Sequence, residues 1–192
     1  NCHLLTSVII PDYVTSIDNY AFYGCNSLIS VIIGNSVTSI DACAFHGCSS
    51  LTELTIVDTT DNPSQLRNID DLAFSNRSLL TSIILPRLVR RIGANAFHNC
   101  CSLTSVIIPE SVTTIDDRAF NNCTSLTSIV IPNSVIIIGW YAFSHCTSLT
   151  SLIIPDSVTS IDKSAFYGCS SLISVTIGNS VTYIDNFTFG WC

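Results

Sequence analysis

The sequence predicts a mainly β solenoid, a single domain over residues 1–192 built from stacked repeats. Three observations support this prediction: a 23-residue period, columns of aliphatic residues at strand-like spacing, and one phenylalanine and one cysteine at fixed places in almost every repeat. Because a repeat of this length cannot bury its apolar face alone, neighbouring repeats must complete the core. We therefore expect about eight coils, with short strands on two faces and a short helical turn in each coil.

A leucine begins each repeat, and the repeats are numbered 1 to 8 in chain order. The step is 23 residues everywhere except from Leu51 to Leu80, where it is 29. Repeat 3 thus carries a six-residue insertion, placed at about residues 58–65, which is polar and contains an Asn-Pro turn. This composition predicts a loop that leaves the stack undisturbed. The repeats begin at Leu5, Leu28, Leu51, Leu80, Leu103, Leu126, Leu149 and Leu172.

Each repeat is expected to contain two strands and a turn. The opening L-T-S-V-I-I is rich in β-branched residues and predicts the first strand. A proline or glycine ends this strand, because proline lacks a backbone donor and glycine permits a sharp bend. A second extended piece, V-T-S-I in most repeats, follows, and the Asp or Gly after it begins the turn that carries Ala-Phe. The residues that end the first strand are Pro11, Gly34, Pro86, Pro109, Pro132, Pro155 and Gly178.

Phenylalanine and cysteine form two columns that we expect to stack as ladders inside the solenoid. Parallel stacking keeps neighbouring Cβ atoms ~4.8 Å apart rather than the ~3.8 Å that a disulfide prefers, so we expect buried free thiols, with some disulfides as the alternative. The Phe column is Phe22, Phe45, Phe74, Phe97, Phe120, Phe143, Phe166 and Phe189, and the Cys column is Cys2, Cys25, Cys48, Cys100, Cys123, Cys146, Cys169 and Cys192.

Composition and motifs exclude several classes of function. Seven Lys plus Arg against 14 Asp plus Glu give a net charge of −7, which disfavours nucleic-acid binding. No apolar run approaches the ~18 residues of a membrane span. No C-x-x-C pair, P-loop, G-x-S-x-G or G-x-G-x-x-G is present, so the sequence predicts no metal, cofactor or catalytic residue, and no enzyme.

The histidines are weak candidates for a metal site. His46 and His98 share a column two repeats apart, which places them ~10 Å from each other, too far to share one zinc ion. We expect them to be solvated turn residues.

Three sequons begin at Asn76, Asn122 and Asn186 and are candidate glycosylation sites if the protein is secreted from a eukaryotic cell. Asn76 and Asn122 are expected in an exposed turn.

The first strand predicts a contact surface. Positions 4 and 6 of the repeat point inward, so position 5 must point outward. An exposed aliphatic ladder of this length is uncommon on a monomer and favours contact with a partner. The alternative is that these residues only favour strand formation and stay exposed to solvent. The outward column, here called the aliphatic stripe, consists of Ile9, Ile32, Ile84, Ile107, Val130 and Ile153, with Thr55 and Thr176 in the same column.

The insertion predicts a second candidate surface. It is acidic, and five of the seven basic residues follow it closely, Arg77 among them. An acidic loop beside arginines on a nearly uncharged body is a place where specificity could reside, and the alternative is a solvated irregular repeat. This candidate partner patch comprises Asp58, Asp61, Arg67, Arg87, Arg90 and Arg91.

The repeat L-T-S-V-I-I-P-x-S-V-T-S-I-x-x-x-A-F-x-x-C-x-S resembles the BspA-like class of leucine-rich repeats, found in surface and secreted proteins of bacteria and protists. The resemblance covers essentially the whole chain. It implies a curved right-handed leucine-rich-repeat solenoid, with a strand on one face and a shorter strand plus turn on the other, and roles in adhesion and protein binding. One departure is that Cys precedes the leucine here, whereas the usual signature places Asn or Cys just after the strand. A parallel β-helix is the alternative fold.

We therefore expect a non-catalytic scaffold, secreted or on the cell surface, that binds a protein or an extracellular-matrix ligand. The chain has no initiator Met and no polar cap at either end, which predicts a section of a longer array. The alternative is a self-assembling filament, in which the end of one copy stacks on the start of the next. An enzyme with a grafted site is a third reading, and it would need a convergent polar cluster that columns of Thr and Ser do not supply.

Overall fold

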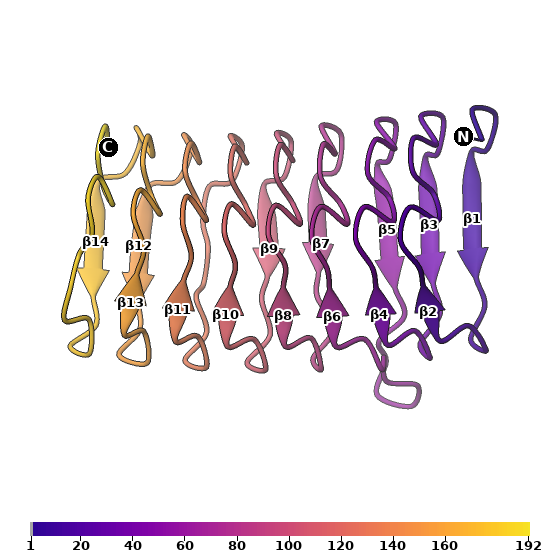
Figure 1. Cartoon of the computed structure of the whole chain (residues 1–192), viewed down its shortest axis with the longest axis horizontal. Coiled ribbons are helices and arrows are strands. Elements are labelled where there is room, and N and C mark those ends of the chain that lie inside the picture. The colour runs from indigo at the N-terminus through magenta and orange to yellow at the C-terminus, as the bar shows by residue number, and fades with distance from the viewer. Residues whose placement is uncertain (1) are drawn as a thin grey trace.

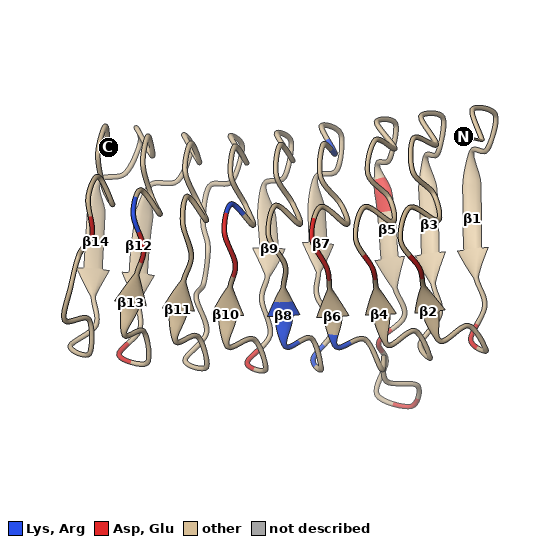
Figure 2. Ribbon diagram, in the orientation of Figure 1, with Lys and Arg blue, Asp and Glu red and all other residues tan. Residues whose placement is uncertain are grey.

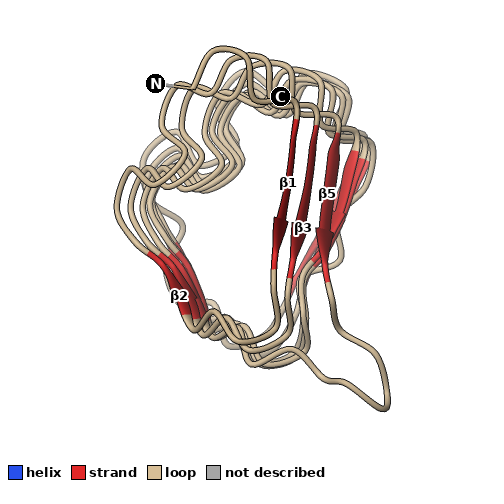
Figure 3. Ribbon diagram, turned by 90° about the vertical axis from the view of Figure 1, so that its right-hand side faces the viewer, coloured by secondary structure: helices blue, strands red, loops and turns tan. Residues whose placement is uncertain are grey.

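A computed structural model describes residues 2–192 as a row of stacked coils (Figure 1). Most coils contribute a strand to each of two opposite sides of the stack (Figure 3), but repeat 6 has no long strand and repeat 8 has no short one. The long strands are β1 (Ser7–Ile10), β3 (Ser30–Ile33), β5 (Glu53–Ile56), β7 (Ser82–Ile84), β9 (Ser105–Ile107), β12 (Ser151–Ile154) and β14 (Ser174–Ile177). The short strands are β2 (Ser16–Ile17), β4 (Ser39–Ile40), β6 (Asn68–Ile69), β8 (Arg91–Ile92), β10 (Thr114–Ile115), β11 (Ile137–Ile138) and β13 (Ser160–Ile161).

The strands pair in parallel and in the register of the sequence repeat. Ser7 lies opposite Ser30, and Ile10 lies opposite Ile33. The short strands form one seven-stranded sheet in the order β13-β11-β10-β8-β6-β4-β2. The long strands divide into β1-β3-β5, β7-β9 and β12-β14. The pairing of the long strands is interrupted between β5 and β7, after the insertion, and again between β9 and β12, where repeat 6 has no long strand, whereas the short sheet continues.

The core confirms the predicted columns. Burial alternates along the first strand: Val31 and Ile33 are buried, and Ile32 between them is exposed. The phenylalanine rings stack from Phe22 to Phe189 with centroids 5.0–5.5 Å apart and planes within 15° of parallel. Each ring therefore packs against the next repeat, and the apolar contacts that hold the solenoid together run along its length.

The expected helical turn is wrong, because no helix occurs in residues 2–192. In repeat 4, Asn95 and Asn99 both have positive φ, at 56° and 59°, and such left-handed residues cannot continue an α-helix. Alternate backbone donors of the turn bond to the next repeat: the N–H of Phe97 donates to the carbonyl of Ala119 at 2.8 Å, whereas the N–H of His98 donates within the turn to the carbonyl of Asn95 at 3.1 Å. Left-handed residues occupy the same two places in all eight repeats. The turn is thus stabilised both by short internal hydrogen bonds and by bonds to the neighbouring repeat.

In this structure the cysteines of the column stack in register, and all ten cysteines are unbridged. From Cys48 onward, each Sγ of the column donates to a phenylalanine carbonyl of the preceding repeat, for example Cys123 to Phe97 at 3.3 Å and Cys146 to Phe120 at 3.4 Å. Burial raises the pKa of Cys123 and Cys146 well above the usual thiol value. These thiols therefore stay protonated at neutral pH and pack as small apolar groups.

Candidate functional site

The structure places the aliphatic stripe on one exposed face. Strand pairing sets Ile9 beside Ile32, and Ile84 beside Ile107. The exposed fraction of the six side chains ranges from 39% for Ile32 to 77% for Val130. Figure 2 shows that charge is almost absent from the long strands, and Glu53 in β5 is the exception. The stripe is therefore an exposed apolar surface that runs along the three groups of long strands.

A hollow interrupts the stripe between repeats 6 and 7. It has a volume of about 390 Å³ and lies where residues 128–131 belong to none of the described strands. Val130 and Ile153 line it together with the buried Ile129 and Ile131. A partner side chain that entered this hollow would contact both outward and inward aliphatic residues.

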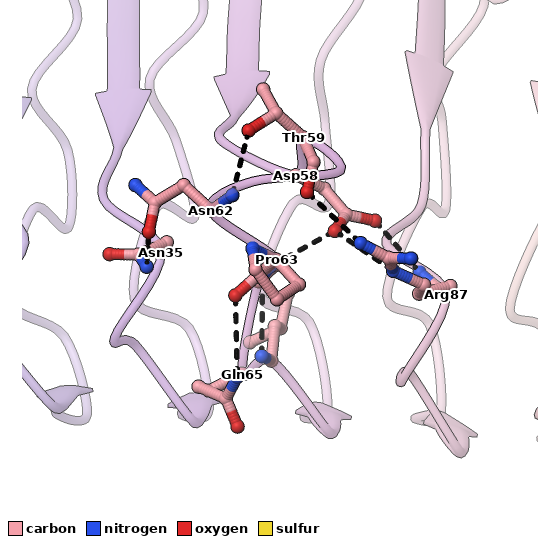
Figure 4. A network of polar contacts seen from close by, with 9 residues as sticks. Asn35, Asp58, Thr59, Asn62, Pro63, Gln65 and Arg87 are labelled. Carbon is pink, nitrogen blue, oxygen red and sulfur yellow. Dashed lines mark hydrogen bonds and ion pairs between the residues drawn. The ribbon is translucent and has the colours of Figure 1, made fainter.

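The inserted loop projects beyond the end of β5 and is well braced (Figures 3 and 4). One Asp58 oxygen accepts from the N–H of Ser64 at 2.9 Å, and the other accepts from the N–H of Arg87 at 3.1 Å. The Arg87 guanidinium also donates to the carbonyl of Thr59 at 3.0 Å. On the opposite side, the side chain of Asn35 donates to that of Asn62. The loop therefore bridges repeats 2, 3 and 4.

The structure separates the candidate partner patch into two groups. Asp58 and Arg87 come together, with an ion pair of 3.4 Å. Arg91 lies apart from them, in β8, and pairs with Asp70, Asp71 and Asp116 at 3.0, 2.9 and 2.8 Å. The remaining members, Asp61, Arg67 and Arg90, are exposed, and none forms an ion pair with a described residue.

Arg77 does not belong to this surface, although the sequence analysis grouped it with the basic run. Its side chain is fully buried. It stands three residues before Leu80, as Cys100 stands three residues before Leu103, so it occupies the cysteine column in repeat 3. Nη1 donates to the carbonyl of Asn76 at 3.3 Å, whereas Nε and Nη2 have no partner among the described residues. Comparison of these two spacings in the sequence could have revealed the buried arginine.

His46 and His98 lie in turns, as expected, but they are half-buried rather than fully solvated. The Nδ1 atoms of His46 and His98 are buried and have no hydrogen-bond partner among the described residues. Burial lowers the pKa of both imidazoles, and the charge of Arg77 lowers that of His46 further. In residues 2–192, no group of three or more His, Cys, Asp or Glu side chains could hold a metal ion.

The sequons differ in their surroundings. Asn76 and Asn122 are half-buried members of an asparagine ladder: Asn122 donates to Asn99, and Asn99 donates to Asn76, each at 2.8 Å. A glycan on Asn122 would replace one of the two hydrogens of Nδ2, the atom that donates this bond. Asn186 is exposed. Glycosylation of these three residues stays a prediction.

One surface cluster was missed by the sequence analysis. Trp140 lies between two cations, with Arg118 at 6.0 Å and Lys163 at 5.6 Å from the ring centroid. Beside it is a hollow of about 320 Å³, lined also by Asp117, Asp162 and Asp185. The residues come from neighbouring columns of repeats 5 to 8, so alignment of the repeats would have brought them together. Cation–π contacts of this kind contribute about 0.5–1 kcal/mol each at exposed sites.

These observations define a class of protein: a leucine-rich solenoid of parallel strands with one exposed aliphatic face. The description "BspA type Leucine rich repeat region (6 copies)" matches residues 1–127 and 113–192. The chain therefore belongs to the BspA-type leucine-rich repeat family, as the sequence resemblance indicated, and the leucine-rich-repeat solenoid is confirmed over the parallel β-helix. No curated protein matches the sequence.

Three solved structures share the fold. A leucine rich cell surface protein from Faecalibacterium prausnitzii A2-165 is 29% identical, with a TM-score of 0.59 over 100% of this chain and 66% of that one. The leucine rich repeat protein of T. pallidum is 30% identical, with a TM-score of 0.60 over 90% and 69%. A leucine-rich repeat protein from Bacteroides ovatus is 25% identical, with a TM-score of 0.52 over 97% and 73%. The chain thus spans about two thirds of the first relative's length.

Proposed function

We propose that the protein is a non-catalytic binding scaffold at the cell surface or outside the cell, and that the aliphatic stripe docks a protein partner, with extracellular-matrix proteins as the partner class. The observation that carries this proposal is the column of exposed side chains from Ile9 to Ile153, which nothing within the chain covers among the described residues. Exposed apolar surface of this extent is typical of interaction sites.

Further observations support the proposal. The F. prausnitzii relative is described as a cell surface protein. Among residues 2–192, no helix is long and apolar enough to cross a membrane. The hollow beside Val130 and Ile153 offers a place for an anchoring side chain. The braced loop at Asp58 and Arg87 adds a polar rim near the end of β5, where charge could select among partners.

Charged substitutions in the stripe are expected to abolish docking. The double variant Val130→Asp, Ile153→Asp places two carboxylates in the hollow, and we expect affinity for immobilised extracellular-matrix proteins to fall by at least about tenfold. The matched control is Thr113→Asp, Thr159→Asp, which adds the same charge at exposed positions of the opposite face. Surface plasmon resonance measures both variants. Equal loss in both would show that net charge, rather than the stripe, controls binding.

A second candidate function is self-assembly by stacking of one copy on the next. The outermost coils expose large apolar side chains: Leu4 is 93% exposed and Ile173 is 87% exposed. β1 and β14 are edge strands of their sheets, and an edge strand is a template for pairing with another chain. A head-to-tail contact of this kind does not close and grows into a filament.

Light scattering tests the self-assembly candidate. If copies stack, the apparent mass rises with protein concentration, and the charged substitutions Leu5→Asp and Phe189→Asp return it to that of a monomer. These side chains lie in repeats 1 and 8, so the central repeats keep their fold, which circular dichroism checks. A concentrated solution of the unmodified chain that stays monomeric excludes the filament.

A further inference from the structure

Repeat 6 departs from the other repeats at the end of its short strand. Repeats 1, 2 and 7 read Val-Thr-Ser-Ile-Asp there, whereas repeat 6 reads Val-Ile-Ile-Ile-Gly and continues with Trp140. The exposed fractions of Ile136, Ile137 and Trp140 are 46%, 39% and 40%. Burial in the core therefore does not account for the apolar side chains that this coil carries on its outside.

Trp140 forms one wall of an open hollow of about 320 Å³. This volume lies within the ~300–1,000 Å³ range of small-molecule sites. Figure 2 shows charged segments directly after β10 and β13, and an uncharged segment after β11, which lies between them. The hollow thus combines an aromatic ring with charged groups of both signs, and these groups are Asp117 of repeat 5, Asp162 and Lys163 of repeat 7 and Asp185 of repeat 8.

The carboxylates of the hollow are oriented by the fold. Asp117 Oδ1 accepts from the N–H of Trp140, and Asp162 Oδ1 accepts from the hydroxyl of Ser160, each at 2.9 Å. Asp185 Oδ1 accepts from the backbone N–H of the next residue. The ion pairs formed within residues 2–192 involve Arg87 and Arg91 only. The Oδ2 atom of each carboxylate, which these bonds leave free, can therefore accept from a ligand.

The charges around the ring nearly balance, which favours a neutral ligand. Three carboxylates line the hollow, and the two cations beside the ring are Arg118 and Lys163, so the sum is −1. The carboxylates would repel an anion, and a cation would compete with the two cations already at the ring. A hydroxyl group both donates and accepts, so it can use a carboxylate and an ammonium together. A neutral ligand with several hydroxyl groups matches this arrangement.

The Trp140 ring matches the apolar face of a sugar. The two cations lie 5.6 and 6.0 Å from its centroid, near the ~6 Å limit of cation–π contact, and the residue stays 40% exposed. The face of an aromatic ring is electron-rich, and it attracts the weakly positive C–H groups on one face of a pyranose. A sugar stacked on the ring would direct its hydroxyl groups toward the carboxylates around it.

We propose that the hollow beside Trp140 binds a neutral oligosaccharide. One sugar ring stacks on Trp140, and its hydroxyl groups donate to Asp117 and Asp162 and accept from Lys163. A second hollow of about 340 Å³ shares Lys163 and is lined by further aromatic side chains, so an adjoining sugar unit packs there. The only lysine and both tryptophans of the chain line these two hollows.

This glycan site is separate from the proposed protein-docking surface. Trp140 follows the short strand β11, whereas the aliphatic stripe belongs to the long strands on the opposite side of the stack (Figure 3). The two proposals therefore succeed or fail independently.

A printed glycan array tests the proposal with the full chain. The protein is biotinylated at its N-terminus, which leaves Lys163 unmodified, and is gathered on streptavidin, because several copies raise the apparent affinity of a weak site. The array carries neutral, sialylated and sulfated glycans. We expect binding to neutral oligosaccharides. Binding confined to the charged glycans, or binding to none, would overturn the proposal.

Two matched variants locate the site. With a neutral oligosaccharide bound on the array, calorimetry should show that Trp140→Ala lowers the affinity by at least about tenfold. This variant is expected to fold, because repeats 2 and 4 carry alanine at the same position, as Ala42 and Ala94. The control is Tyr13→Ala, which removes an aromatic residue that is 84% exposed in repeat 1 and should leave the affinity unchanged. Equal affinities of both variants would refute the role of Trp140.

Acetylation of Lys163 gives a readout that needs no substitution. Because the chain has no other lysine, an amine-reactive acetylating reagent modifies one side chain, and peptide mass spectrometry measures its rate. The bound oligosaccharide should slow this reaction by at least about fivefold when the site is mostly occupied. An unchanged rate at saturating oligosaccharide would place the glycan elsewhere and contradict the proposal.

Discussion

Replacement of Phe97 or Phe120 by alanine is expected to lower the free energy of unfolding by about 3–5 kcal/mol. Both rings are fully buried, and each stacks on rings of two neighbouring repeats at 5.3–5.5 Å. Removal of one ring therefore leaves a cavity and breaks the stack on both sides. Because repeats contact only their neighbours, the loss weakens two interfaces of the solenoid at once. Urea denaturation followed by circular dichroism measures the change.

The matched control is Ile107→Ser in the aliphatic stripe. Ile107 is 59% exposed, so its replacement removes little buried surface, and we expect a change within about 0.5 kcal/mol. If the control destabilised the protein as much as Phe97→Ala does, the outward column would be part of the core and the proposed docking surface would not exist. Phe22 is a second control. Because its side chain is only partly buried, Phe22→Ala should lower the free energy of unfolding by less than Phe97→Ala does.

Substitution of Arg77 by methionine is expected to stabilise the protein by about 1–4 kcal/mol. Methionine fills a similar volume, needs no hydrogen bonds, and removes a buried charge that has one hydrogen bond and no ion-pair partner among the described residues. Thermal unfolding monitored by circular dichroism checks the prediction. A rise in midpoint with an unchanged spectrum is the expected result.

The control for this prediction is Arg91→Met, the same substitution at a partly exposed arginine. Arg91 pairs with Asp70, Asp71 and Asp116, so methionine there removes three ion pairs and leaves the carboxylates close to one another. We expect no gain in stability and a loss of at most about 1 kcal/mol, since solvent screens these charges. If Arg77→Met destabilised the protein, Arg77 would be forming interior contacts that outweigh the desolvation of its charge.

Most of the fold could be predicted from the repeat period in the sequence. A step of 23 residues with phenylalanine in one column permits only a stack in which each ring contacts the next, and the rings from Phe22 to Phe189 do so. Alternation along the first strand likewise placed Ile107 outside and Val106 inside. These predictions succeeded because identical neighbours impose the same environment on every residue of a column.

The tertiary structure decided what depends on contacts between repeats. The sequence predicted a helical Ala-Phe turn, but alternate backbone donors bond to the following repeat, as Phe97 does to Ala119, and two left-handed residues interrupt the helical conformation. The sequence grouped Arg77 with the surface arginines Arg67 and Arg87. The six additional residues form a loop before Arg77, and the 23-residue register continues after that loop. Arg77 therefore occupies the cysteine column, and its side chain lies in the core. Residue type predicts exposure for an isolated arginine, but position in a stacked column overrides that preference, because the backbone of the neighbouring repeats determines which way the side chain points.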